Sequence, residues 1–246
     1  MTGSALAARS ARVRSLHIGG VTPFTNIDFP GRLAMVVFVQ GCPWRCGYCH
    51  NPHLQSRVAA GEDSPEWAHV LELLARRRGL LDAVVFSGGE PTVDAGLATA
   101  LADVRRLGFE TGLHTAGIYP GRLVRVLGGL DWIGFDIKAP LGRPAVFDRV
   151  TGVAGSVEAV RESAQIVLRS GVSCEFRTTA HPELLRDEDL LDLAGQLASM
   201  GATTYALQVA RPTAAATLEA VGADYPAPAT LSRLAELFPD FTLRRA

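Results

Sequence analysis

The sequence predicts an α/β fold, specifically a partial (β/α)6 barrel with parallel strands. From Leu33 onward, short β-rich runs alternate with helical patterns, and the turns from helix to strand carry the glycine that commonly ends a helix. Repeated βα units imply a parallel sheet with right-handed crossovers. Six units are too few for a closed eight-stranded barrel, and no linker-like change of composition divides the chain.

The predicted strands are β-rich runs of five to eight residues, at 33–40, 83–87, 110–115, 132–138, 173–179 and 204–209. The predicted helices lie between or after them, at 65–78, 95–107, 121–127, 157–170, 187–200 and 229–237. Residues 241–244 can add an edge strand. One domain over residues 19–246 accounts for all of these elements.

Residues 1–18 are predicted to form a flexible leader, because they are rich in alanine and lack the apolar segment of a secretory signal. The chain carries 24 Lys and Arg against 25 Asp and Glu, so no basic excess indicates nucleic-acid binding. No apolar run approaches the roughly 20 residues that span a bilayer. We therefore expect a cytoplasmic protein that binds neither nucleic acid nor membrane.

Polar residues gather where the predicted parallel strands end, which is where functional residues of such folds collect. The strand period of two places Gly134, Asp136 and Lys138 on one face, and Glu175 and Arg177 on one face of the next strand. Strands buried on both faces would be hydrophobic throughout. These two strands therefore predict a polar cavity inside the barrel.

Three of the four cysteines, Cys42, Cys46 and Cys49, follow the first predicted strand with the spacing C-x3-C-x2-C. Thiolates are preferred ligands of iron–sulfur clusters and of zinc. Three thiolates would leave one iron of a [4Fe–4S] cluster open to another ligand. A Cys3His zinc site would add His50 as the fourth ligand. Because His50 is adjacent to Cys49, the two side chains would struggle to reach the same tetrahedral ion. A thiol redox pair, Cys46 with Cys49, leaves Cys42 unexplained.

The sequence C-x3-C-x-aromatic-C after the first strand resembles the signature of the radical S-adenosylmethionine (SAM) superfamily, over about Gly19 to Val209. This resemblance implies that Cys42, Cys46 and Cys49 bind three irons of a [4Fe–4S] cluster and that SAM chelates the fourth. It also implies reductive cleavage of SAM to methionine and a 5′-deoxyadenosyl radical, which abstracts hydrogen from a substrate.

Other residues resemble the SAM-binding motifs of that superfamily. Ser87–Pro91 (SGGEP) is similar to its GGE motif, where glycine lets a ligand approach the main chain, and Tyr48 matches an aromatic position near the adenine. Asp136-Ile137-Lys138 resembles the D-x-K motif of glycyl-radical activating enzymes, and Arg177 lies in a similar strand-five motif. The implied SAM-binding residues are Tyr48, Gly88, Gly89, Glu90, Asp136, Lys138 and Arg177.

Structural roles remain open for the same residues. The two glycines can form an ordinary turn, Asp136 and Lys138 a plain ion pair, and Arg177 a pair with Glu175. The sequence His114–Gly117 (HTAG) also departs from the D-T-N-G expected after the third strand. Any polar contact that the missing asparagine would make is therefore in doubt.

Residues 27–32 (IDFPGR) and 38–42 (FVQGC) resemble activases of glycyl radical enzymes, most of all the anaerobic ribonucleoside-triphosphate reductase activating proteins. The implied partners are a glycyl radical enzyme subunit, the anaerobic ribonucleotide reductase, and a flavodoxin- or ferredoxin-type electron donor. Residues 28–32, Ser173, Glu175, Arg177 and Gln208 are candidates for lining the entrance to the barrel. Two other hypotheses remain: a radical SAM enzyme acting on a small molecule, such as a 7-deazapurine synthase, and a zinc-binding interaction module.

Overall fold

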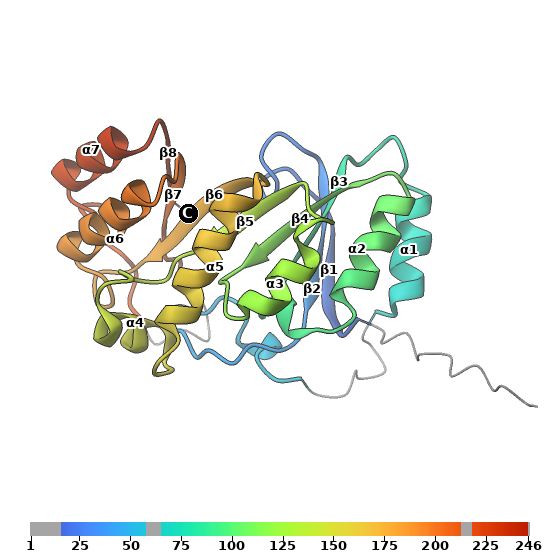
Figure 1. Cartoon of the computed structure of the whole chain (residues 1–246), viewed down its shortest axis with the longest axis horizontal. Helices are drawn as coiled ribbons and strands as arrows, with labels where there is room; N and C mark the ends of the chain where they lie inside the picture. Colours follow the sequence, from blue (N-terminus) through green and yellow to red (C-terminus); the bar gives the residue numbers. More distant parts are fainter. Residues whose placement is uncertain (1–15, 58–64, 213–217, 246) are drawn as a thin grey trace, which may run out of the picture.

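The computed structural model describes residues 16–57, 65–212 and 218–245. A single sheet of eight strands runs through the molecule in the order β1 to β8 (Figure 1). The first strand is antiparallel to the second, and every later neighbouring pair is parallel. The α/β fold with a mostly parallel, unclosed sheet confirms the predicted partial barrel.

The strands are β1 (Ile18–Thr25), β2 (Ala34–Val39), β3 (Ala83–Gly88), β4 (Glu110–Thr115), β5 (Trp132–Asp136), β6 (Ser173–Ala180), β7 (Thr204–Val209) and β8 (Asp240–Arg244). The helices are α1 (Trp67–Ala75), α2 (Leu97–Arg106), α3 (Pro120–Leu127), α4 (Pro144–Thr151), α5 (Val157–Ser170), α6 (Asp187–Ser199) and α7 (Pro228–Leu237). Two short 3-10 turns are η1 (Pro52–Leu54) and η2 (Pro91–Val93). All six predicted strands, all six predicted helices and the edge strand, which is β8, are present.

Two elements are absent from the sequence-based prediction. The strand β1 contains Gly19, Gly20 and Pro23, residues that weaken a strand pattern, and its pairing with β2 is what holds it extended. The helix α4 has only eight residues and lies in the connection from β5 to α5. A helix this short owes its stability to packing, which local sequence does not reveal.

The predicted leader over residues 1–18 lies mostly outside the described residues. Leu16 and Ile18 fall within it, and both are buried in the main core, 4% and 2% exposed. The folded domain therefore includes Leu16, which corrects the predicted boundary at residue 19. The apolar side chains at these two positions pack with those of β2, and that contact between separate segments fixes the start of β1.

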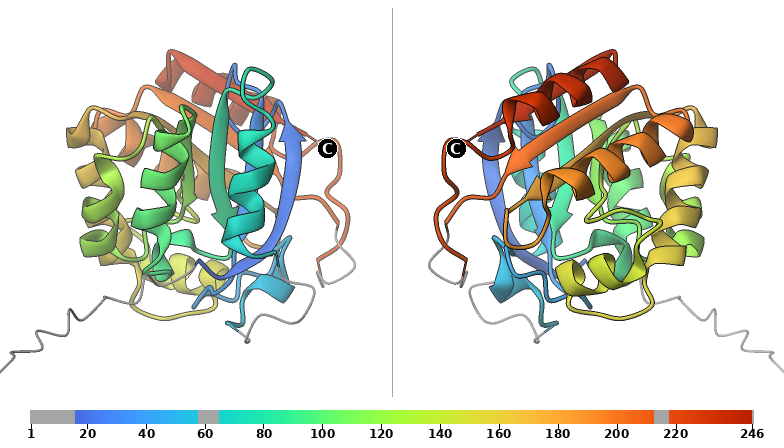
Figure 2. Two further views of the ribbon diagram at one scale, coloured as in Figure 1. Left: turned by 90° about the vertical axis from the view of Figure 1, so that its right-hand side faces the viewer. Right: turned by 90° about the vertical axis from the view of Figure 1, so that its left-hand side faces the viewer.

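The two faces of the curved sheet differ in what covers them. Helices lie along the outer face and bury alternate strand residues such as Val37, Phe86 and Ile133 in the main core (Figure 2). On the inner face, a small second core is centred on Phe29 stacked on Trp132, with ring centroids 5.1 Å apart. This core fills the inner face toward the starts of the strands, so the polar residues lie toward their ends.

The sheet stays open because β1 and β8 are its two edges and do not pair with each other. Near the β8 edge, Arg244 donates two hydrogen bonds to the carboxylate of Glu175, at 2.8 and 2.7 Å, and so bridges β8 to β6 across β7. In the part of the chain that the structure describes, no helix has the length and apolar character needed to cross a membrane.

Candidate active site

The cysteine loop, residues 41–50, follows β2 and is fastened to the segment that comes after it. The amide of Gly41 donates to the carbonyl of Leu54 at 2.7 Å, and the amide of Cys42 donates to the carbonyl of Gln55 at 3.0 Å. The start of the loop therefore lies against the segment that follows it, and the two ends of the loop are held together. These hydrogen bonds hold the first cysteine in place without any help from its side chain.

The helix α4, which the sequence analysis missed, receives the other side of the cysteine loop. Trp44 is 2% exposed and packs edge-on against Phe147, with centroids 5.8 Å apart. The amide of Arg45 donates to the carbonyl of Thr151 at 2.8 Å. Trp44 and Arg45 had no predicted role, and the structure gives both of them the role of anchoring the loop.

The three thiols of the loop, on Cys42, Cys46 and Cys49, are all free and half-buried. Burial raises the pKa of Cys42 to about 12 and also raises the pKa of Cys46, against the opposing effect of Lys138. Among the described residues, no three side chains of His, Cys, Asp or Glu converge closely enough to hold one metal ion. A cluster binds each thiolate through a different iron, so its ligands need not converge on one point as zinc ligands do.

Gly88 and Gly89, where β3 ends, lie against the backbone of the cysteine loop and of β2. A Cβ on Gly88 would lie 2.5 Å from the backbone N and O of Val39, and one on Gly89 would lie 2.4 Å from the carbonyl oxygen of Gly41. The φ of Gly88 is also +118°. The close approach that requires glycine at these two positions is therefore to protein backbone, and the predicted approach of a ligand to the same glycines stays a prediction.

Replacing Gly89 with alanine is expected to lower the free energy of unfolding by about 2 kcal/mol, because the added methyl overpacks a rigid backbone contact. The Gly41 carbonyl cannot move away easily, since it also accepts a hydrogen bond from the amide of Glu90 at 2.8 Å. Urea unfolding of the metal-free protein measures the change. Gly195→Ala, in the middle of α6 with open space around its Cβ, is the control and is expected to gain about 0.5–1 kcal/mol. Similar effects of the two variants would contradict this reading.

The carboxylate of Glu90 is 1% exposed and fully hydrogen-bonded within the protein. It accepts from the amide and hydroxyl of Thr92 at 3.1 and 2.6 Å, from the hydroxyl of Thr115 at 2.7 Å and from the amide of Ala116 at 2.9 Å. Burial raises its pKa. The side chain joins the ends of β3 and β4, so any part that Glu90 has in cofactor binding comes through the turn that it stabilises.

Asp136 lies between two cations on the inner face. Lys138 Nζ donates to its Oδ2 at 3.0 Å, and Arg177 Nε donates to its Oδ1 at 3.1 Å. Burial opposes the charge of Asp136, but the two cations outweigh burial and hold its pKa at about 2. The partner of Arg177 is therefore Asp136 rather than Glu175. Two cations and one anion leave a net positive site, which suits a ligand carboxylate.

Tyr48 turns inward from the cysteine loop toward the same cations. Lys138 Nζ lies 5.6 Å from the centre of its ring. Its hydroxyl is buried and has no hydrogen-bond partner among the described residues, and the same is true of Oε1 of Gln40, two residues before Cys42. Buried polar atoms are normally paired, so a polar ligand at the Tyr48 hydroxyl would supply the partner that the described residues do not.

His114 joins this network, although the sequence analysis gave it no role. Its Nε2 lies 2.8 Å from the carbonyl oxygen of Asp28, and its Nδ1 lies 3.2 Å from the hydroxyl of Ser87. Burial, followed by the charge of Arg177, lowers its pKa to about 3, so the ring is neutral and Nε2–H donates to Asp28. Through His114, the segment after β1 is tied to the inner face beside Arg177. No local pattern could have shown this contact, because 86 residues separate Asp28 and His114.

The low pKa of His114 predicts a loss of stability in mild acid. The unfolded chain takes up a proton near pH 6.5 and the folded chain only near pH 3, so stability is full above pH 6.5 and falls as the pH drops toward 3. Between pH 7 and pH 5, urea unfolding should show the wild type losing about 2 kcal/mol more than His114→Gln, which has no titrating ring. Equal losses in both proteins would show that His114 is protonated in the folded state.

Of the four side chains predicted to line the entrance, three have other contacts. Glu175 is held by Arg244, and Arg177 by Asp136. The amide oxygen of Gln208 lies 3.5 Å from the hydroxyl of Thr179, also on the inner face. Ser173 is exposed at the start of β6. Ser173 thus lies at the opposite end of the strand from the cysteine loop, which argues against its place at a common entrance.

Comparison with known proteins identifies relatives of this arrangement. Residues 36–194 match the Radical SAM superfamily. A Methanocaldococcus jannaschii protein that carries the name of a glycyl-radical enzyme activating enzyme is 25% identical over 181 residues, 72% of this chain and 73% of its own. Pyruvate formate-lyase-activating enzyme of Clostridium pasteurianum is 36% identical over 135 residues, 52% of each chain. PqqA peptide cyclase of Gluconobacter oxydans is 31% identical over 160 residues, 63% of this chain and 44% of its own.

Solved structures share the fold at lower identity. A radical SAM methyltransferase from Sphaerobacter thermophilus has a TM-score of 0.66 at 18% identity, over 91% of this chain and 68% of that one. SuiB of Streptococcus suis, in a structure bound to S-adenosylmethionine, has a TM-score of 0.61 at 14% identity, over 84% of this chain and 48% of that one. The cysteine loop, the Gly88-Gly89 turn, Asp136, Lys138 and Arg177 all lie within the matched residues 36–194.

Proposed function

This chain belongs to the radical SAM superfamily, and we propose that it is an activating enzyme that generates a glycyl radical on an anaerobic ribonucleotide reductase. As a radical SAM enzyme it uses a [4Fe–4S] cluster and SAM. When bound, these groups supply an electron and a 5′-deoxyadenosyl radical able to abstract a hydrogen atom. The identity of the molecule that this radical attacks requires an experiment.

We assign the cluster to the thiols of Cys42, Cys46 and Cys49. They are the only cysteines of the loop, and their anchoring by backbone hydrogen bonds and by α4 leaves the thiols free. The fourth cysteine, Cys174, faces the outer side of β6 and packs against the main core. Burial raises its pKa to about 12, as it does for Cys42, so its position on the outer face and not its pKa sets it apart from the three loop cysteines.

SAM fits the inner face next to this loop. Lys138 and Arg177 offer positive charge to its carboxylate, while Asp136, whose side chain is 27% exposed, offers a carboxylate to its amino group. The orphan hydroxyl of Tyr48 gains a polar partner in this arrangement. Gly88, Gly89 and Glu90 hold the adjacent strand end and its backbone groups in place. In this proposal the chain's own residues bind and orient the cofactor beside the cysteine loop.

The open sheet is the observation that supports a protein substrate. A polypeptide loop can reach the inner face only if the sheet leaves one side open, and β1 and β8 do not pair. The segment 27–32, which resembles that of the activases, contacts the inner face through Asp28 and Phe29. The two relatives named as activating enzymes add support for this class.

The deciding experiment mixes the reduced protein, SAM and the large subunit of an anaerobic ribonucleotide reductase from the same source. We expect a doublet EPR signal of a glycyl radical on the partner, with release of 5′-deoxyadenosine. Cys46→Ala should abolish the signal, and Cys174→Ala should retain it. SAM cleavage with an EPR-silent partner would instead support action on a small molecule.

A further inference from the structure

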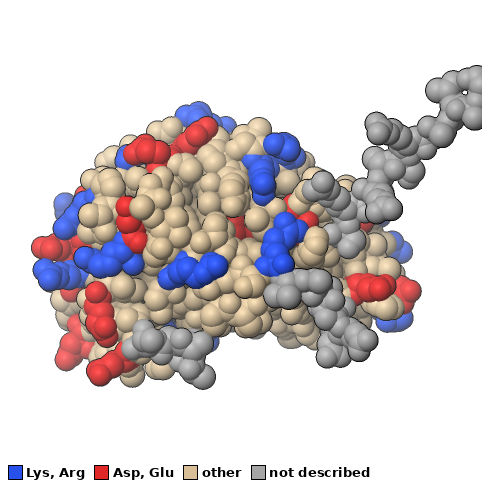
Figure 3. All heavy atoms as spheres, turned by 90° about the horizontal axis from the view of Figure 1, so that it is seen from below, with Lys and Arg blue, Asp and Glu red and all other residues tan. Residues whose placement is uncertain are grey.

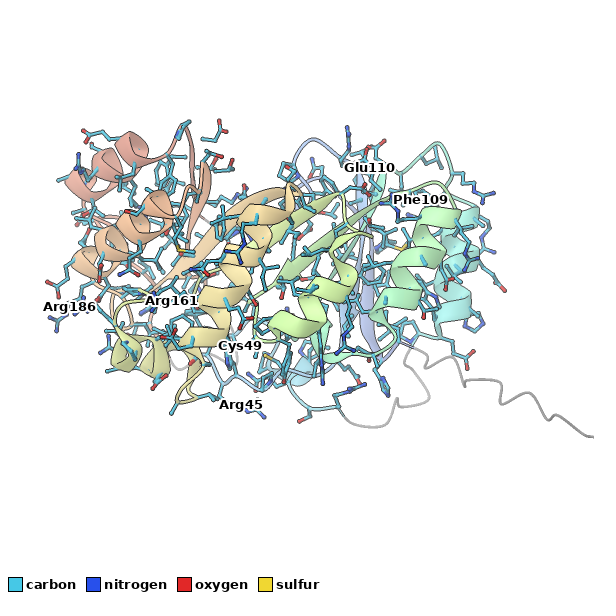
Figure 4. The ribbon with its side chains drawn as sticks, viewed as in Figure 1. Arg45, Cys49, Phe109, Glu110, Arg161 and Arg186 are labelled. Carbon is cyan, nitrogen blue, oxygen red and sulfur yellow. The ribbon has the colours of Figure 1, made fainter. Side chains whose placement is uncertain are left out.

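A recess of about 670 Å³ is lined by the η2 turn, the start of α2 and the side of α3. These segments follow the ends of β3 and β4, so the recess lies at the end of the molecule where Figure 4 labels Arg45 and Cys49, opposite Phe109 and Glu110. None of the residues proposed to hold the cluster or SAM lines it. The recess is therefore separate from the candidate site on the inner face.

Most of the charged side chains that line the recess are arginines. They are Arg57, Arg122 and Arg125, and the lining also includes His17 and one carboxylate, that of Asp94. Figure 3 views this end of the molecule and shows Lys and Arg groups across its middle, with most Asp and Glu groups toward the left and right sides. Three arginines against one carboxylate leave the recess positively charged.

The carboxylate of Asp94 is buried, with its side chain 1% exposed, and it is hydrogen-bonded within the protein. Its Oδ1 accepts from the amide of Gly96 at 2.7 Å. Its Oδ2 accepts from Arg57 at 2.9 Å and from the amide of His17 at 3.2 Å. Asp94 therefore holds Arg57 in place and can neutralise the charge of only one arginine.

Arg122 and Arg125 lie one turn apart on α3, and neither forms an ion pair within the described residues. Arg122 donates to the carbonyl of Val93 at 2.7 Å, and Arg125 Nε donates to the carbonyl of Gly121 at 3.2 Å. A backbone carbonyl is a neutral acceptor, so these bonds orient the two side chains without cancelling their charges. Both guanidinium groups can therefore still attract an anion.

The start of α2 adds backbone donors to the same recess. Leu97 and Ala98 line it, and the first hydrogen bond of the helix runs from the amide of Ala100 to the carbonyl of Gly96 at 3.0 Å. The amides of Ala98 and Thr99 precede this bond and have no acceptor among the described residues. The positive end of the helix dipole thus adds to the attraction for an anion that the arginines provide.

We propose that this recess binds the diphosphate group of a small molecule. Guanidinium groups match the oxygens of phosphoryl groups in pairs, and a diphosphate carries enough negative charge to engage more than one arginine. The volume of about 670 Å³ lies within the range of small-molecule sites, roughly 300–1,000 Å³. Free diphosphate and a nucleoside diphosphate share this chemistry. The proposal depends on neither the cluster nor SAM.

The test places a carboxylate in the recess with Ala98→Glu and compares it with the uncharged control Ala98→Gln. An acidic residue in the first turn of a helix is favourable, so Ala98→Glu should fold. Calorimetry on the reconstituted protein measures the binding of pyrophosphate. We expect saturable binding to the wild type and to Ala98→Gln, and binding at least about tenfold weaker to Ala98→Glu. Absence of saturable binding to the wild type, or equal binding to both variants, would overturn the proposal.

Further variants check the location of the site. Arg125→Gln should weaken pyrophosphate binding, and Arg125→Lys should restore part of it. Arg122 is unsuitable for this purpose because its side chain also holds the η2 turn. Lys138→Met, in the proposed SAM site, should bind pyrophosphate as the wild type does. A loss of binding in Lys138→Met would place the anion on the inner face and refute the proposal.

A comparison of ligands identifies what the recess recognises. ADP, adenosine and tricarballylate, a small tricarboxylate, are titrated into the wild type beside pyrophosphate. Tighter binding of ADP than of pyrophosphate, with no binding of adenosine, would assign the recess to a nucleotide. Equal affinity for ADP and pyrophosphate would assign it to the diphosphate group alone. Tricarballylate that binds as tightly as pyrophosphate would contradict recognition of phosphoryl groups.

Discussion

Cys46→Ala is expected to lose essentially all bound iron after anaerobic reconstitution, where the wild type should hold about four irons per chain. Cys46 is the middle one of the three proposed ligands, and a cluster held by three thiolates loses an iron site with each thiolate removed. Cys42→Ala and Cys49→Ala should behave alike. Iron and sulfide analysis, together with the broad absorption that dithionite bleaches, measures the effect.

Cys174→Ala is the matched control for this prediction. The residue packs against the main core from β6, on the face opposite Glu175 and Arg177. Removal of its thiol should leave the iron content unchanged. The free energy of unfolding should fall only by the lost packing of one small side chain. Full iron content in Cys46→Ala, or loss of iron in Cys174→Ala, would overturn the ligand assignment.

Asp136→Ala is expected to have the second largest effect, a loss of about 3 kcal/mol in the free energy of unfolding. Lys138 and Arg177, whose side chains are 12% and 8% exposed, would be left as unpaired cations in a largely buried site. Urea unfolding of the metal-free protein measures this cost. Calorimetry on the reconstituted protein should also show weaker SAM binding, because the carboxylate proposed to bind the SAM amino group is gone.

Lys138→Met tests the role of this site in SAM binding separately from its role in protein stability. The pair of Asp136 with Arg177 remains, at 3.1 Å, so we expect a smaller loss, of about 1 kcal/mol, in stability. SAM affinity should nevertheless fall at least about tenfold, as expected when a charge-assisted hydrogen bond is removed. If both variants lose stability and bind SAM as the wild type does, the three charges form only a structural network.

The alternation of side chains between the two faces of a strand predicted part of the site from the sequence. Because successive side chains point to opposite faces, Asp136 could be placed with Gly134 and Lys138 from the sequence, and Arg177 with Glu175. The structure confirms these faces, since Arg177 contacts Asp136 and its guanidinium occupies the space left by Gly134. The partner of each charge was not predictable, because it depends on the register between β5 and β6.

The sequence by itself determined the fold class, the cysteine loop and the polar inner face, because each depends on short-range spacing or on periodicity. Only the tertiary structure decided the pairing of β1 with β2, the contact of His114 with Asp28 and the packing of Trp44 in the cysteine loop against Phe147 of α4. Each of these joins segments that are separate along the chain, such as those of Trp44 and Phe147. Contacts of this kind arise from how strands and helices pack, and packing is decided by the whole chain together.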